Sequence, residues 1–174
     1  MTEREWPSVT EIGAHTGGPL GKIYTESVEV EFAVTLRHRD TQAAIAFSGG
    51  GWVPTAWPQI PVALRIGMSG YFQAFKGPTE GWTAVEPLIY QVNETYIVEM
   101  GINVKDNTYC CTVYTTDKSG GNVKPHRIDV DFPFRLGTGA PPIPAITAID
   151  TVYLGPGNGK AIYIIRDFRV VDGK

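Results

Sequence analysis

Large aromatic and planar polar side chains recur at positions where the chain is not expected to build its core. Three tryptophans, Trp52, Trp57 and Trp82, stand in or beside loop segments. Indole rings offer flat apolar surfaces to the C–H faces of sugars, and planar polar groups orient hydroxyl-rich ligands. A further set on the predicted strands has the parity that points away from the core: Arg65, Tyr71, Gln73, Glu99, Asn103, Thr112 and Tyr114. Together these residues form the predicted ligand-binding set, and their chemistry suits carbohydrate binding.

Groups suited to catalysis or metal binding are sparser. The histidines lie in turns or near the start of the chain: His15, His38 and His126. No His or Cys residues have the spacing of a metal-ligand set. Asp106, Asn107 and Asp117 could build a calcium site with backbone oxygens, but turn chemistry explains the same residues equally well. We therefore expect no catalytic residue and no cofactor, with calcium left open.

The composition is typical of one globular domain. The chain has 174 residues, of which 43% are hydrophobic and 19% are charged. Its net charge of −3 and its lack of a basic cluster argue against nucleic-acid binding. No apolar run reaches the roughly 18 residues of a membrane span. Residues 1–13 lack the apolar region of a signal peptide, so the chain is either cytoplasmic or, as we favour, a domain excised from a secreted protein.

The organising element is a predicted antiparallel hairpin over residues 95–116. In both arms every second residue is apolar, and this set comprises Tyr96, Val98, Met100, Ile102, Val104, Tyr109, Cys111 and Val113. Such a period of two predicts strands that are buried on one face only. The polar residues 105–108 supply the turn. Cys110 and Cys111 face opposite sides of the second arm, so we expect two free thiols, with Cys111 in the core.

Alternating runs on either side of this hairpin predict further strands. We expect them over residues 27–36, 42–48, 60–67, 71–76, 82–85, 87–91, 128–134, 145–154 and 161–171. Glycine and proline punctuate residues 1–22, which we expect to be an irregular lead-in with a short strand near residues 9–12. Many short strands bounded by turns predict an all-β, antiparallel two-sheet β-sandwich formed by residues 1–174 as one domain. A closed barrel is the competing architecture and is less favoured.

Three short motifs in the predicted strands carry a resemblance to a known family. They are Asn107-Thr108-Tyr109-x-x-x-Val113, Asp131-Phe132-Pro133-Phe134-Arg135 and Arg166-Asp167-Phe168-Arg169-Val170. With the surrounding strands, over residues 27–171, they resemble laminin-G-like domains of the concanavalin-A-like lectin and glucanase superfamily. The resemblance implies a jelly roll of two curved sheets, with sugars bound on the concave face or on rim loops in many members. It also implies that the outward-facing set of the central strands lies on that concave face.

Some members of this superfamily are enzymes, and the sequence departs from their catalytic patterns. The hydrolases carry Glu-x-Asp-x-(x)-Glu on one strand, whereas Glu29-Val30-Glu31 is followed here by Phe32-Ala33. The alginate lyases carry Gln-x-His, whereas Gln59-Ile60 is followed by Pro61. The sequence therefore predicts a non-catalytic, lectin-like module that binds a polysaccharide or glycan. A polysaccharide lyase or glycoside hydrolase is one alternative. A protein-interaction module, joined to other domains or to a second copy of itself, is the other.

Overall fold

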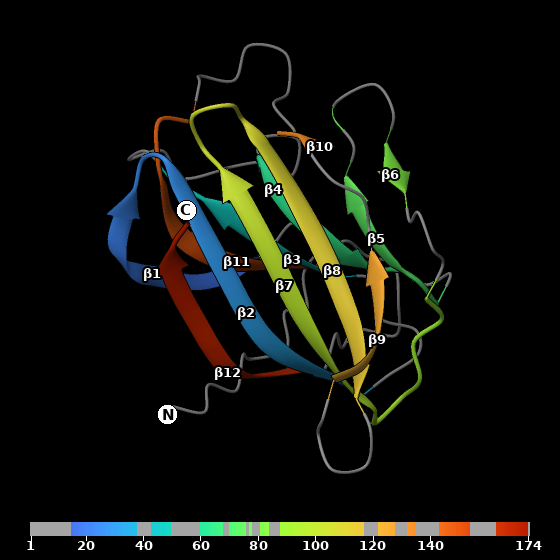
Figure 1. Ribbon diagram of the computed structural model, residues 1–174. Coiled ribbons are helices and arrows are strands. Elements are labelled where there is room, and N and C mark those ends of the chain that lie inside the picture. Colours follow the sequence, from blue (N-terminus) through green and yellow to red (C-terminus); the bar gives the residue numbers. More distant parts are fainter. Residues whose placement is uncertain are drawn as a thin grey trace.

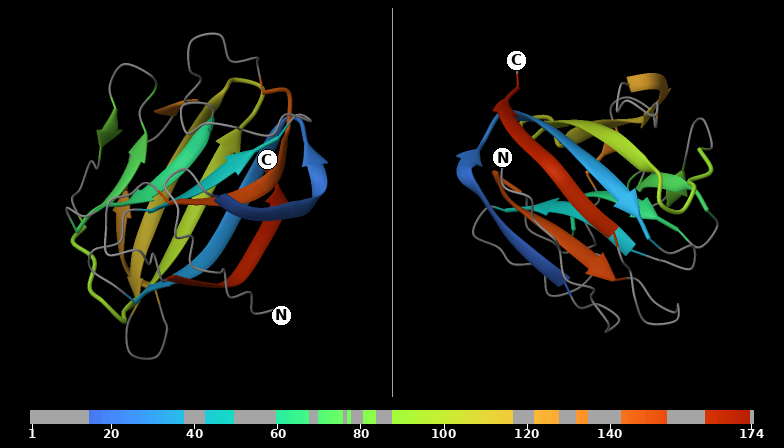
Figure 2. Two further views of the ribbon diagram at one scale, coloured as in Figure 1. Left: turned by 180° about the vertical axis from the view of Figure 1, so that it is seen from behind. Right: turned by 90° about the horizontal axis from the view of Figure 1, so that it is seen from below.

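The computed structural model describes residues 15–37, 43–49, 60–67, 70–75, 77, 81–83, 88–116, 122–127, 132–134, 143–153 and 163–173. These residues form twelve strands in two six-stranded sheets, and every strand pairing is antiparallel. The sheets pack face to face as two layers (Figures 1 and 2). The predicted all-β sandwich is therefore confirmed. No helix within these residues is long and apolar enough to cross a membrane.

Sheet A contains the predicted central hairpin. In spatial order its strands are β10 (Phe132–Pro133), β8 (Thr108–Thr116), β7 (Thr95–Asn103), β2 (Ser27–Leu36) and β12 (Tyr163–Asp172), and β9 (Asn122–Arg127) also pairs with β8. Burial alternates residue by residue along β7, as the sequence predicts. Asn107 adopts a φ of 54° in the turn between β7 and β8, a conformation that Asn tolerates better than most residues.

Sheet B supplies the opposite layer. In spatial order its strands are β1 (His15–Tyr24), β11 (Ile146–Tyr153), β3 (Ala43–Ser48), β4 (Val62–Ile66), β5 (Phe72–Phe75) and β6 (Trp82–Thr83). Strands β3 to β6 follow one another in both sequence and space, so they form a meander (Figure 1). This meander carries Arg65, Gln73 and Trp82.

The core lies between the sheets and consists of inward-facing residues from both layers. Its largest fully buried side chains include Phe32, Phe47, Phe72 and Tyr96. Buried tyrosines find partners for their hydroxyl groups, as their polar tips require. The Tyr96 hydroxyl accepts a bond from the backbone N–H of Gln91 at 2.7 Å. Cys111 is fully buried in this core, whereas Cys110 lies on the opposite face of β8, as expected from their parity.

Three segments differ from the sequence prediction. The strand expected over residues 87–91 is wrong, because residues 88–91 lie outside any strand and Ile89 forms an isolated bridge with Tyr71. Residues 15–22, expected to be irregular, belong to strand β1. Within the described residues this strand is the edge of sheet B and pairs with β11 alone. An edge strand accepts glycine and proline that a central strand would exclude. Strand β9, which contains Pro125, was likewise not predicted, and the strand expected over residues 128–134 is described only as β10. The strand expected near residues 9–12 lies outside the described residues.

Candidate functional site

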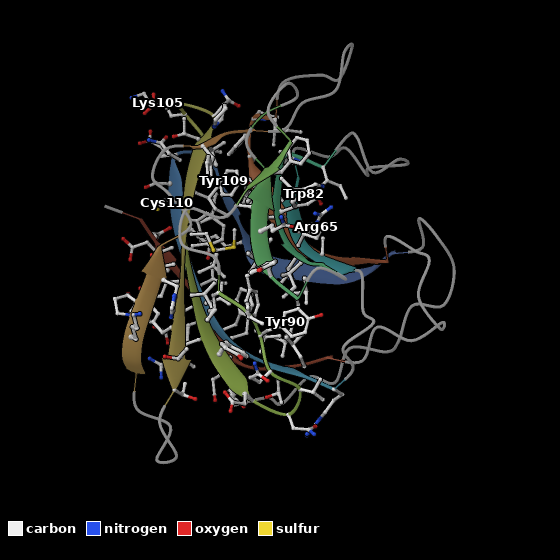
Figure 3. The ribbon with its side chains drawn as sticks, turned by 90° about the vertical axis from the view of Figure 1, so that its right-hand side faces the viewer. Arg65, Trp82, Tyr90, Lys105, Tyr109 and Cys110 are labelled. Carbon is white, nitrogen blue, oxygen red and sulfur yellow. The ribbon has the colours of Figure 1, made fainter. Side chains whose placement is uncertain are left out.

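An aromatic and cationic cluster occupies the outer face of sheet B. We define the Arg–Trp cluster as Arg65 of β4, Gln73 and Phe75 of β5, and Trp82 of β6. Arg65 and Gln73 are direct partners across the sheet, and Phe75 and Trp82 are the next such pair. Figure 3 shows the Arg65 and Trp82 side chains next to each other. The structure thus unites three predicted ligand residues from three successive strands.

Specific contacts hold the cluster together. Arg65 Nε donates to Gln73 Oε1 at 3.0 Å, and Arg65 Nη2 donates to the same oxygen. The guanidinium carbon of Arg65 lies 4.6 Å from the centroid of the Trp82 ring, within range of a cation–π interaction. The Phe75 ring meets the indole edge-on, with centroids 5.0 Å apart and an interplanar angle of 85°. Arginine and tryptophan are therefore positioned together before any ligand arrives.

Strand alternation explains why these side chains reach this face. Leu64 and Ile66 point into the core on either side of Arg65, and Phe72 and Ala74 do so on either side of Gln73. Outward positions of the neighbouring strands are filled mostly by alanine. Ala44, Ala46, Ile60 and Ala63 form a small buried cluster against which Trp82 packs. Because alanine is short, the indole can lie close to the sheet.

The electrostatic environment of Arg65 is unusual for an arginine. Its side chain is partly buried, and this burial lowers the pKa of the guanidinium from its ordinary value. Its contacts are the neutral amide of Gln73 and the neutral ring of Trp82. Among the residues that the structure describes, no carboxylate lies within ion-pair distance of Arg65. The cluster therefore presents a positive charge that no carboxylate of the described residues neutralises.

The other predicted aromatic residues have different outcomes. Tyr71 is partly buried and forms an isolated antiparallel bridge with Ile89. Tyr71 precedes Gln73 by two residues and so has the same parity. It therefore lies on the side of sheet B that carries the cluster. Trp52 and Trp57 lie outside the described residues, and their part in binding stays a prediction.

The remaining predicted residues lie on the other sheet, which corrects the expectation of one shared face. Strands β7 and β8 of sheet A carry Glu99, Asn103, Thr112 and Tyr114. Their outer face is on the opposite side of the sandwich from the Arg–Trp cluster, separated from it by the core (Figure 3). Parity tells which side of its own strand a residue occupies, but not to which sheet that strand belongs. Both groups face outward, in opposite directions.

A groove of about 520 Å³ runs along this outer face of sheet A. Its lining includes Glu29, Glu31, Glu99, Gly101, Cys110, Thr112 and Arg169. The sequence lacked a third acid after Glu29 and Glu31, but β7 supplies one, because Glu99 is the direct cross-strand partner of Glu31. Tyr114 donates its hydroxyl to Glu99 Oε2 at 2.8 Å, and Arg169 Nη1 lies 3.9 Å from Glu31 Oε1. Strand periodicity alone cannot reveal this pairing, because it requires the register between β2 and β7.

Asn103 has a local structural role in the same sheet. Its side-chain amide donates to Asp106 Oδ2 at 2.7 Å, and its side-chain oxygen accepts the backbone N–H of Asp106 at 3.0 Å. These bonds stabilise the turn between β7 and β8. Within the described part of the chain, no group of three or more acidic, His or Cys side chains could hold a metal ion.

Comparison with known proteins places the fold. No family model and no curated protein sequence matches the chain. A sialidase structure matches with a TM-score of 0.56 at 14% identity, over 91% of this chain and 14% of the sialidase. A variant of human galectin-16 matches with a TM-score of 0.52 at 14% identity, over 99% of this chain and 100% of the galectin. The catalytic domain of a glycoside hydrolase family 131 protein from Coprinopsis cinerea matches with a TM-score of 0.51 at 11% identity, over 87% and 58%.

These structures share one architecture. The chain has the concanavalin-A-like jelly-roll fold. This concanavalin-A-like sandwich spans the whole length of the galectin but only a small part of the sialidase. At these identities the likeness concerns the fold, and the narrower laminin-G-like assignment stays a prediction. Because lectins and a hydrolase domain both use the fold, function must be argued from the sites.

Proposed function

We propose that this protein is a non-catalytic, lectin-like carbohydrate-binding module whose glycan lies on the outer face of sheet B. The observation that carries the proposal is the Arg–Trp cluster, in which the Trp82 indole is fixed beside the donors of Arg65 and the amide of Gln73. An aromatic surface next to planar polar groups supplies both requirements of sugar recognition: an apolar platform, and groups that orient hydroxyls. The galectin-like architecture is compatible with this role.

Preorganisation strengthens the case. The Arg65 side chain is held by Gln73 on one side and by the Trp82 ring on the other, so little rotamer freedom remains to be lost when a ligand binds. Tyr71 extends the same side of the sheet. Trp52 and Trp57 belong to the proposal as further aromatic contacts, on the basis of sequence alone.

Binding should be measured by isothermal titration calorimetry of the whole chain against a panel of neutral and acidic oligosaccharides. Trp82→Ala is expected to reduce affinity about fivefold to hundredfold, since stacking of a nucleic-acid base, another flat ligand, on an aromatic side chain is worth about 1–3 kcal/mol. Tyr114→Phe is the matched control, because it alters an aromatic residue of the opposite face. No heat with any glycan, or equal loss in both variants, would contradict the proposal. A flat response to glycans together with a stable dimer would favour the protein-interaction alternative.

The groove on sheet A gives the enzyme alternative its own test. Glu31 and Glu99 are directly opposed, and such partners have Cβ atoms about 4.5–5.5 Å apart. Retaining glycoside hydrolases need two carboxyl groups about 5–5.5 Å apart, and side chains on such neighbouring Cβ atoms can bring their carboxyl groups to that separation. This pair therefore makes glycoside hydrolysis the second candidate. Release of reducing ends from a polysaccharide, abolished by Glu31→Gln, would establish enzymatic cleavage of glycosidic bonds at this groove. If the polymer stays intact after long incubation, the enzyme alternative is wrong and the lectin-like role is favoured.

A further inference from the structure

Arg65 differs in its partners from Lys22 and Arg169, two other cations of the described chain. Arg37 also bonds a neutral amide, that of Asn93, but it is exposed to solvent. Lys22 Nζ lies 2.5 and 2.6 Å from the two carboxylate oxygens of Asp172. Arg169 Nη1 lies 3.9 Å from Glu31 Oε1. Both of those cations are largely exposed, yet each faces a carboxylate. Arg65 is more buried than either, and its partners among the described residues are Gln73 and Trp82.

Such an arrangement is unfavourable unless something else neutralises the charge. Removing a cation from water disfavours its charged form, and nearby opposite charge normally offsets that cost. Burial alone lowers the pKa of the Arg65 guanidinium, with no compensating carboxylate. Groups whose pKa is shifted by burial are concentrated at functional sites. The missing anion is therefore expected to come from the ligand.

The contacts of Arg65 also leave donors in a defined orientation. Gln73 Oε1 accepts bonds from both Nε and Nη2, which fixes one edge of the guanidinium plane. Stacking on Trp82 fixes the tilt of that plane. Arginine has five N–H donors, so those of Nη1 and the second of Nη2 stay available within the described structure. Two parallel N–H groups on one planar fork match the two oxygens of a carboxylate.

We propose that the sheet B site selects acidic glycans, with Arg65 binding the carboxylate of a hexuronic acid residue while Trp82 contacts a sugar ring. This inference deepens the proposed function and rests on it. Gln73 then acts as a positioning residue, because it orients the guanidinium. The selectivity arises from one charge on one face, and the acidic groove of sheet A has no part in it.

The test compares one polymer in two chemical forms. Oligosaccharides of a hexuronic acid are titrated into the whole chain, followed by the same oligosaccharides after reduction of their carboxyl groups to primary alcohols. A hydrogen bond to a charged group contributes about 1.5–3 kcal/mol, so the acidic form is expected to bind about tenfold to hundredfold more tightly. Added salt should weaken the binding of the acidic oligosaccharides more than that of the reduced ones. Arg65→Gln should bring the two forms to similar affinity, and Arg65→Lys should restore part of the preference.

A matched control distinguishes the two faces. Arg169→Gln removes a cation from the sheet A groove and is expected to leave the preference unchanged. If Arg169→Gln abolishes the preference, or if Arg65→Gln leaves it intact, acid recognition at Arg65 is wrong. If the neutral form binds as well as the acidic form in the unmodified protein, the acidic selectivity is wrong but the lectin-like role stands. If neither form nor any other glycan binds, both proposals fail. Near-ultraviolet circular dichroism of each variant verifies that it is folded.

Discussion

The Tyr109 hydroxyl of sheet A bonds to both backbone groups of Phe75 in sheet B. Phe75 N–H donates to it at 2.9 Å, and it donates to Phe75 C=O at 2.7 Å. The Tyr109 ring is buried between the sheets (Figure 3). These bonds fix β5 at the residue that packs against Trp82. The central hairpin of the sequence thus positions the candidate site on the opposite layer.

Tyr109→Phe tests this link. The variant leaves two buried backbone groups without their hydroxyl partner, so the free energy of unfolding should fall by about 1–3 kcal/mol. Urea denaturation measures the change. Tyr114→Phe, which removes a bond from a more exposed hydroxyl, serves as control and should cost less. Equal losses in both variants would show that the bonds to Phe75 do not contribute as proposed.

Gly49 is expected to tolerate no side chain. A Cβ atom there would lie 2.5 Å from the backbone oxygen of Ala145 and 2.6 Å from the backbone nitrogen of Thr147. Because both atoms belong to the backbone, Gly49→Ala should destabilise the fold by about 1–3 kcal/mol. Gly101→Ala is the comparison, since its Cβ would meet only the Cys110 sulfur at 3.0 Å, and that side chain can turn. The melting temperature should fall further in Gly49→Ala than in Gly101→Ala, and the reverse order would contradict this account.

The two cysteines should differ sharply in reactivity. Burial raises the pKa of the Cys111 thiol far above its ordinary value, and the side chain is fully enclosed, so the reactive thiolate is scarce and inaccessible. Cys110 is partly exposed in the sheet A groove. Iodoacetamide treatment of the native protein at pH 8, followed by peptide mass spectrometry, should modify Cys110 alone. Modification of Cys111 is expected only after unfolding. Native labelling of Cys111 at a comparable rate would show that this strand opens readily.

The facing acids of sheet A should weaken the sheet slightly. Glu31 and Glu99 are direct cross-strand partners, and like charges in that relation are destabilising. Replacing Glu31 by Gln should therefore raise the free energy of unfolding at neutral pH by a few tenths of a kcal/mol. The same substitution removes the 3.9 Å contact with Arg169, and the small stabilisation from that contact reduces the gain. Urea denaturation in low salt gives the largest difference. A clear loss of stability would mean that the contact with Arg169 outweighs the repulsion.

Much of the fold could be predicted because strand burial leaves a period-two record in the sequence. The alternation from Tyr96 to Val104 matches the observed burial of β7 residue by residue. Strand β1 is not predicted from the sequence, because Gly17, Gly18 and Pro19 in isolation indicate a loop. An edge strand accepts these residues. Strand β9 was missed for a similar reason, since it contains Pro125.

The candidate site was predictable in residue type but not in assembly. Parity correctly predicts that Arg65, Gln73 and Glu99 face away from the core, but it does not reveal that Glu99 belongs to the other sheet. The stacking of Arg65 on Trp82 depends on the order of β4, β5 and β6 and on the alanines beneath the indole, which are long-range properties. The opposition of Glu31 and Glu99 likewise depends on register. Single-strand patterns contain none of this information.

The most direct test of glycan binding on sheet B is to map the perturbed residues by NMR. Amide and indole N–H resonances of the labelled protein would be followed while an oligosaccharide that binds in calorimetry is added. The account predicts saturable shifts at the Trp82 indole, at the Arg65 and Gln73 amides and around Tyr71, with sheet A unchanged. Shifts confined to Glu31, Glu99 and Thr112 would contradict it and move the ligand to the opposite groove.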